Sequence, residues 1–116
     1  MLRKALQRRA AVRYKLRLPV IFHWNDGVEH TSGGFTSDVA LDGALILSSD
    51  CPPVGSDVRV EVLLPSPEMR NEELRIGSSG KVVHTSGQSG ISAFGFHGMF
   101  EDEKLTRHVL NFVASR

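Results

Sequence analysis

The sequence predicts a mainly β protein, a small antiparallel six-stranded β-barrel followed by one C-terminal α-helix. Its 116 residues are enough for one hydrophobic core but not for two. Short apolar runs alternate with turn residues, among them 11 glycines and five prolines, which favours several β-strands. Near the C-terminus the apolar residues recur instead at the spacing of a helix.

The first half of the barrel is predicted from three apolar runs. Leu18–Trp24 forms a first strand, and Asn25–Gly27 has the composition of a tight hairpin turn. A second strand runs from about Glu29 to Val39. Gly43–Ser48 forms a third, which a Ser-Asp-Cys-Pro-Pro loop ends.

The second half contains the clearest strand. In Val58–Leu64 every second residue is apolar, which is typical of a half-buried strand. Leu74–Ile76 and Lys81–His84 are expected to form one strand broken by Gly77–Gly80, or two short strands with a bulge. Ile91–His97 is the last strand.

The final segment has helical periodicity. An apolar stripe recurs at i, i+4, i+7 and i+8, and acidic residues in the first turn suit the positive end of a helix dipole. The stripe is Leu105, Val109, Phe112 and Val113, and the acidic residues are Glu101, Asp102 and Glu103. One helix packed against the barrel is therefore expected.

Basic residues are concentrated at the N-terminus. Residues 1–17 contain seven of the 14 lysines and arginines, whereas all 13 acidic residues lie beyond them. We therefore divide the chain into a basic arm, residues 1–17, and the barrel with its helix, residues 18–116. Such an arm suits an anionic partner, although a solvated tail would show the same charge pattern.

Several function classes are not supported. The single cysteine, Cys51, excludes an internal disulfide, and no apolar run is long enough to span a membrane, so we expect a cytoplasmic protein. The five histidines are scattered without the spacing of a metal site. No motif for a catalytic nucleophile or for a cofactor is present, so we expect neither an enzyme nor a bound cofactor.

Two short patterns remain. RAAVR (Arg9 to Arg13), preceded by Arg8, supplies guanidinium groups that can donate paired hydrogen bonds to guanine or to phosphate. DVALDG (Asp38 to Gly43) lies at the junction of the second and third strands and supplies a carboxylate that can accept from guanine N–H groups. Together they favour an anionic ligand with guanine-like edges.

These patterns, their order and their spacing resemble the PilZ family of bacterial cyclic di-GMP receptors, which pairs an RxxxR motif with a D/NxSxxG motif. The strand segments and the closing helix also fall where that family, a split barrel, has them. The resemblance implies that Arg9 and Arg13 contact guanine and phosphate and that Asp38 accepts from guanine. It implies that Gly43 lets the ligand approach, although a backbone angle that only glycine tolerates would also explain this residue.

Ala40 departs from the family motif, which has serine there. The lost hydroxyl would weaken a ligand contact by about 0.5–1.5 kcal/mol, so we expect Ala40→Ser to strengthen binding. In the family, an arginine at the place of Arg8 accompanies two stacked cyclic di-GMP molecules, so two ligands per chain are expected. Arg8 could also be one more solvated charge.

The predicted function is a cyclic di-GMP receptor whose arm, mobile without ligand, folds over the ligand and signals to an unidentified downstream protein. On this view Arg9→Ala and Arg13→Ala weaken binding without changing the melting temperature. The alternative is a degenerate PilZ-like adaptor that binds proteins but no nucleotide. Nucleic acid is a weaker candidate, because the barrel is acidic and aromatic residues are few.

Overall fold

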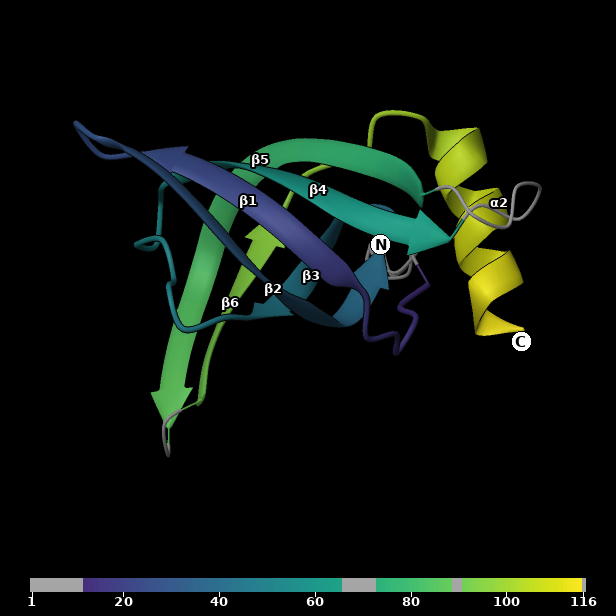
Figure 1. The fold of residues 1–116 in the computed structure, drawn as a ribbon, viewed down its shortest axis with the longest axis horizontal. Coiled ribbons are helices and arrows are strands. Elements are labelled where there is room, and N and C mark those ends of the chain that lie inside the picture. Colours follow the sequence, from purple (N-terminus) through teal and green to yellow (C-terminus); the bar gives the residue numbers. More distant parts are fainter. Residues whose placement is uncertain (1–11, 66–72, 89–90, 116) are drawn as a thin grey trace, which may run out of the picture.

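The computed structural model describes residues 12–65, 73–88 and 91–115. In this part of the chain a closed antiparallel barrel of six strands is followed by one helix, as the sequence predicted (Figure 1). The elements are β1 (Pro19–Asn25), β2 (Glu29–Ala40), β3 (Gly43–Leu47), β4 (Asp57–Pro65), β5 (Glu73–Gln88), β6 (Ile91–His97) and α2 (Glu103–Ala114).

The strands neighbour one another in the order β1-β2-β3-β6-β5-β4, and β4 pairs with β1 to close the barrel. The alternation predicted for β4 is confirmed, because Val58, Val60, Val62 and Leu64 are all at most 3% exposed. Phe22 and Phe94 fill the interior with their rings edge to face, 4.9 Å apart. This interior is the single core of the described chain.

The strand β5 is continuous, so the predicted break at Gly77–Gly80 is wrong. All four residues pair in register with β4. The irregularity lies further along, where the pairing with β6 shifts between Val82 and His84. One extra residue, Val83, therefore bulges out of β5.

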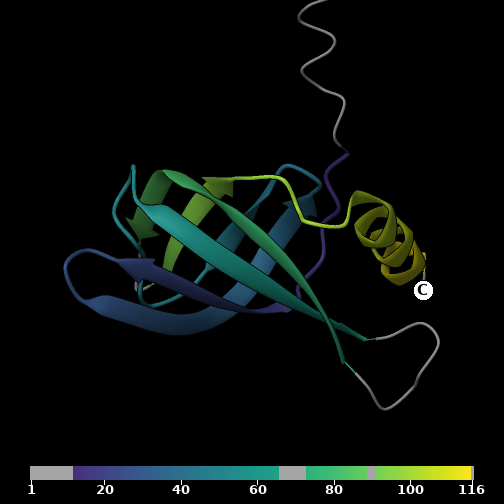
Figure 2. The same cartoon turned by 90° about the horizontal axis from the view of Figure 1, so that it is seen from above.

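The helix α2 lies beside one end of the barrel (Figures 1 and 2). It begins after Asp102, whose side chain caps it by accepting from the Leu105 N–H. Its buried residues are Thr106, Val109 and Leu110. The buried face of the helix is therefore rotated by part of a turn from the predicted stripe, since Leu105 and Phe112 are each 37% exposed. Neither length nor hydropathy would let a helix in the described residues cross a membrane.

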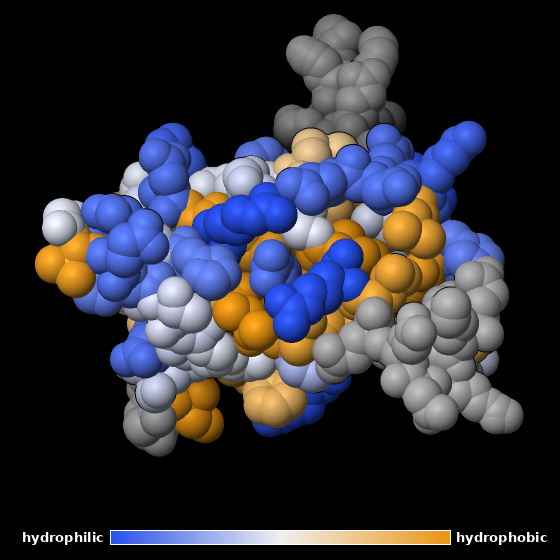
Figure 3. Space-filling view, turned by 45° about the horizontal axis from the view of Figure 1, so that its top comes forward, coloured by the Kyte–Doolittle hydropathy of each residue, from blue (hydrophilic) through white to orange (hydrophobic). Residues whose placement is uncertain are grey.

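Hydrophobic side chains also reach the surface, and Figure 3 shows them between hydrophilic ones on one face of the molecule. The large hydrophobic residues that are most exposed include Val12, Val28, Val54, Ile91 and Met99. They come from different parts of the chain, and isolated exposed residues of this kind are normal in globular proteins.

The end of the basic arm is attached to the barrel, which the sequence did not predict. Tyr14 exchanges two backbone hydrogen bonds with Val39 of β2, at 2.7 and 2.9 Å. The buried hydroxyl of Thr36 donates to the Leu16 carbonyl and accepts from the Leu18 N–H. Residues 12–17 are therefore part of the folded structure, while residues 1–11 lie outside the described part.

Candidate functional site

An ion pair joins the two sequence patterns. Nη2 of Arg13 donates to Oδ1 of Asp38 at 2.5 Å, across 25 residues of sequence. The Arg13 side chain is 55% exposed, whereas that of Asp38 is only 12% exposed. The pair thus has a nearly buried carboxylate and a guanidinium that still reaches solvent.

A cavity of about 270 Å³ opens beside this pair. Its polar lining comes from Arg13, Asp38, Asp42, His84 and His97, and Leu45 contributes apolar surface. These residues belong to the arm, to β2, to the turn that follows β2, and to β3, β5 and β6. The cavity therefore collects side chains from segments that are far apart in the sequence.

Backbone geometry places both members of the ion pair. The hydrogen bonds of Tyr14 with β2 hold the arm against the strand that carries Asp38. A register shift between Thr36 and Asp38 sets Asp38 opposite Leu45 of β3. A bulge of this kind re-aims the following side chain, which here brings Asp38 to the cavity.

Gly43 has a packing reason to be glycine. It is the first residue of β3 and pairs with His97 of β6. A Cβ at Gly43 would lie 2.3 Å from the backbone oxygen of Phe96. No larger residue fits without moving β6, although Gly43 also lines the cavity.

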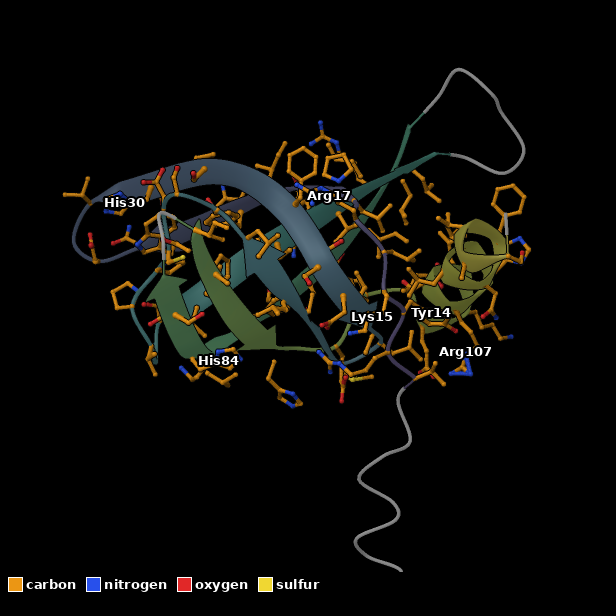
Figure 4. All side chains as sticks on the ribbon, turned by 90° about the horizontal axis from the view of Figure 1, so that it is seen from below. Tyr14, Lys15, Arg17, His30, His84 and Arg107 are labelled. Atoms are coloured by element: carbon orange, nitrogen blue, oxygen red, sulfur yellow. The ribbon has the colours of Figure 1, made fainter. Side chains whose placement is uncertain are left out.

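Sequence reasoning missed His84, His97 and Asp42 as part of this site. His84 and His97 are exposed and come from neighbouring strands of the barrel. Figure 4 labels His84, which points outward from the surface of these strands, away from the barrel interior. Only the pairing of β5 with β6 brings the two imidazoles to one surface, so no local pattern could have shown it.

Tyr14 was also missed. Its hydroxyl donates to Oδ1 of Asn111 on α2 at 2.7 Å. Figure 4 shows Tyr14 between the arm and the helix. Tyr14 therefore connects the segment that carries Arg13 to α2.

A larger hollow of about 480 Å³ lies over β1, β4 and β5. Trp24 lines it, together with Arg59 and Lys81. Both cations pair with acidic residues, Arg59 with Glu101 and Lys81 with Asp57. Since no described residue of the two sequence patterns lines this hollow, we place the candidate site at the smaller cavity.

No group of three or more metal-ligating side chains occurs among the residues that the structure describes. Cys51 is a free thiol, and burial together with the neighbouring charge of Asp50 raises its pKa above the ordinary value. A raised pKa lowers the thiolate fraction and so the reactivity of this side chain. Recognition through hydrogen bonds and charge is the chemistry that the cavity supports.

Comparison with known proteins identifies the family. The model of the PilZ domain matches residues 7–115. The chain belongs to the PilZ domain family. PilZ domains are non-enzymatic receptor and adaptor domains, typically receptors for cyclic di-GMP.

Solved structures of PilZ proteins have the same fold. The inhibitor of motility MotI/DgrA from Bacillus subtilis superposes with a TM-score of 0.71 at 16% identity, over 91% of this chain and 49% of that one. The chain thus spans about half the length of MotI/DgrA. The PilZ domain of CeSA from a cellulose-synthesizing bacterium gives a TM-score of 0.54 at 18% identity, over 87% of this chain and 97% of that one. A search of curated proteins finds no match.

The structure brings together only some of the residues that were expected at the PilZ site. Arg13, Asp38 and Gly43 line one cavity. Ala40 is fully buried, so its side chain offers no surface to a ligand. Arg8 and Arg9 lie outside the described residues.

Proposed function

We propose that this PilZ domain is a cyclic di-GMP receptor that binds its ligand in the cavity beside Arg13 and Asp38. The observation that carries the proposal is their ion pair at 2.5 Å, because it unites an arginine of the RxxxR pattern with the acidic residue of the DVALDG pattern. Both groups are complementary to guanine. The guanidinium can donate to O6 and N7, and the carboxylate can accept from the N–H groups.

The ion pair leaves hydrogen-bonding capacity for a ligand. A guanidinium has five N–H donors, and the structure records one bond from Arg13 to Asp38. A carboxylate accepts at two oxygens, of which Oδ1 takes this bond. Arg13 and Asp38 can therefore hold each other in position and contact the ligand at the same time.

The cavity alone is small for cyclic di-GMP. Its volume of about 270 Å³ lies below the range of roughly 300–1,000 Å³ that is common for ligand pockets. We propose that residues 1–11 of the arm, which include Arg8 and Arg9, cover the rest of the ligand. The guanidinium groups of Arg8 and Arg9 would contact phosphate and guanine, and Arg8 would bind a second, stacked ligand.

Ordering of the arm over the ligand would change the surface that a downstream protein meets. The contacts of Tyr14 give this change a route to the rest of the fold, because Tyr14 follows Arg13 directly and hydrogen-bonds to Asn111 of α2. A receptor without catalytic groups can transmit a signal in this way.

Calorimetric titration with cyclic di-GMP tests the proposal, with GTP and a short oligonucleotide as controls. We expect cyclic di-GMP alone to bind, with two molecules per chain, and Arg13→Ala to lose about 1–3 kcal/mol of binding free energy. Arg75→Ala is a matched control, because the Arg75 side chain is also 55% exposed but pairs with Glu61, away from the cavity. Affinity that is the same in Arg13→Ala as in the wild type would contradict the assigned site.

A degenerate adaptor is the second candidate, and the buried Ala40 in place of the motif serine favours it. The same titration separates the two functions. A folded wild-type protein that gives no heat with cyclic di-GMP would be the adaptor. One ligand per chain, or two ligands retained in Arg8→Ala, would contradict the role assigned to Arg8.

A further inference from the structure

We propose that His84 is a ligand-binding residue of this site, that it forms the wall opposite Arg13 and Asp38, and that its protonation makes ligand affinity depend on pH. The inference rests on the proposed function. It adds a residue that belongs to neither sequence pattern and a form of regulation that neither pattern implies.

Register places His84 in line with Asp38. Neighbouring partners across the sheet are Asp38 of β2, Leu45 of β3, Gly95 of β6 and His84 of β5. Adjacent strands lie about 4.8 Å apart, so the row spans about 14 Å along the barrel surface. Asp38 and His84 thus stand at the two ends of a floor made by Leu45 and Gly95.

Two bulges produce this alignment. Without the shift between Val82 and His84, Val83 would stand opposite Gly95. The extra residue moves His84 into that position on the outer face. The shift between Thr36 and Asp38 acts on the other end of the row in the same manner.

The imidazole is held close to the strand beside it. A Cβ built on Gly95 would lie 2.5 Å from Nε2 of His84 and 3.0 Å from its Cδ2 and Cε1. The ring therefore occupies the space that a side chain at position 95 would fill. Because Gly95 has no side chain, the ring rests over the β6 backbone and lines the cavity.

The described lining of the cavity carries little positive charge. Among the described lining residues, Asp38 and Asp42 are acidic, and Arg13 alone carries a permanent positive charge. Arg13 is also paired with Asp38. Each cyclic di-GMP adds two negative charges from its phosphodiesters, so a protonated imidazole on the facing wall would offset part of the repulsion, beside the arginines of the arm.

Position favours His84 over His97 as the residue that faces the ligand. His97 of β6 pairs in register with Lys81 of β5, whereas His84 stands beside Gly95 in the row that ends at Asp38. The charged groups that line the cavity with His84 are the carboxylates of Asp38 and Asp42 and the guanidinium of Arg13. A bound anionic ligand would attract a positive charge on the His84 imidazole.

The test measures cyclic di-GMP affinity by calorimetry at about pH 6 and about pH 8, where histidine is the side chain that ordinarily changes charge. We expect wild-type affinity to be about tenfold higher at the lower pH. Titration near pH 7 in buffers of different ionisation enthalpy should show net uptake of protons on binding. His84→Gln should abolish both effects and keep its fold, because the side chain is exposed.

Matched controls are His97→Gln in the same cavity and His108→Gln on α2, and both should keep the pH dependence and the proton uptake. Retention of both effects in His84→Gln, or their loss in His97→Gln alone, overturns the assignment of His84 while the receptor function stands. A wild-type protein that binds no cyclic di-GMP at either pH overturns the receptor function and this assignment with it.

Discussion

Arg13→Ala should destabilise the protein even without ligand. The substitution removes the partner of a carboxylate whose side chain is only 12% exposed. Breaking a fully buried ion pair costs about 3–5 kcal/mol, whereas an exposed pair contributes about 0.2–1 kcal/mol. Since the Arg13 side chain is 55% exposed, we expect an intermediate loss of about 1–2 kcal/mol.

Thermal unfolding of the ligand-free protein measures this loss. For a domain of this size 1 kcal/mol corresponds to about 4 °C, so the melting temperature should fall by about 4–8 °C. Arg75→Ala is the control, and its smaller effect follows from the greater exposure of Glu61, 25% at the side chain, and the longer distance of 3.2 Å. We expect that control to lose no more than about 1 kcal/mol.

A second substitution distinguishes the unpaired carboxylate from other causes. Adding Asp38→Asn to Arg13→Ala removes the uncompensated charge and should recover about half of the lost stability. An Arg13→Ala protein that melts like the wild type would refute the reasoning. It would mean that residues 12–17 are loose in solution, as the sequence alone predicted.

Three further predictions concern single side chains. Tyr14→Phe should lower the free energy of unfolding in urea by about 0.5–1.5 kcal/mol, because the hydrogen bond to Asn111 is lost, and an unchanged value would mean that this bond does not form. Gly43→Ala should cost about 1–3 kcal/mol in the same assay, because its Cβ would meet a backbone oxygen at 2.3 Å, and wild-type stability would contradict that clash. Cys51 should react slowly with iodoacetamide at about pH 8, and faster in Asp50→Asn, because burial and the Asp50 charge raise its pKa; a rate equal to that of a free thiol would contradict this.

The sequence predicted the fold where local patterns and packing agree. Alternating valines in β4 face the core because a closed barrel buries one side of each strand. The four residues Gly77–Gly80 suggested a break, but pairing with β4 keeps them in a strand. The helical stripe was misplaced because Thr106, a polar residue, packs at the buried face of α2. In both cases tertiary contacts override local propensity.

The site was predicted only where its residues belong to a sequence pattern. Arg13 and Asp38 were expected together, and their ion pair agrees with that expectation. The attachment of the arm was missed, because it depends on the buried hydroxyl of Thr36, which binds Leu16 and Leu18. His84 was missed because its place depends on one extra residue in β5, a feature without a local signal.

The attachment of the arm bears on how this PilZ domain can signal. Arg13 and Tyr14 are adjacent, so one cannot be displaced far without the other. Arg13 bonds to Asp38 at the cavity, and Tyr14 bonds both to the backbone of Val39 and to the side chain of Asn111. In the proposed receptor, a ligand that draws the Arg13 guanidinium toward its own phosphates would therefore act on the segment that connects β2 with α2. The same short segment would sense the ligand and present the response on the helix, so occupancy of the cavity need not reshape the barrel.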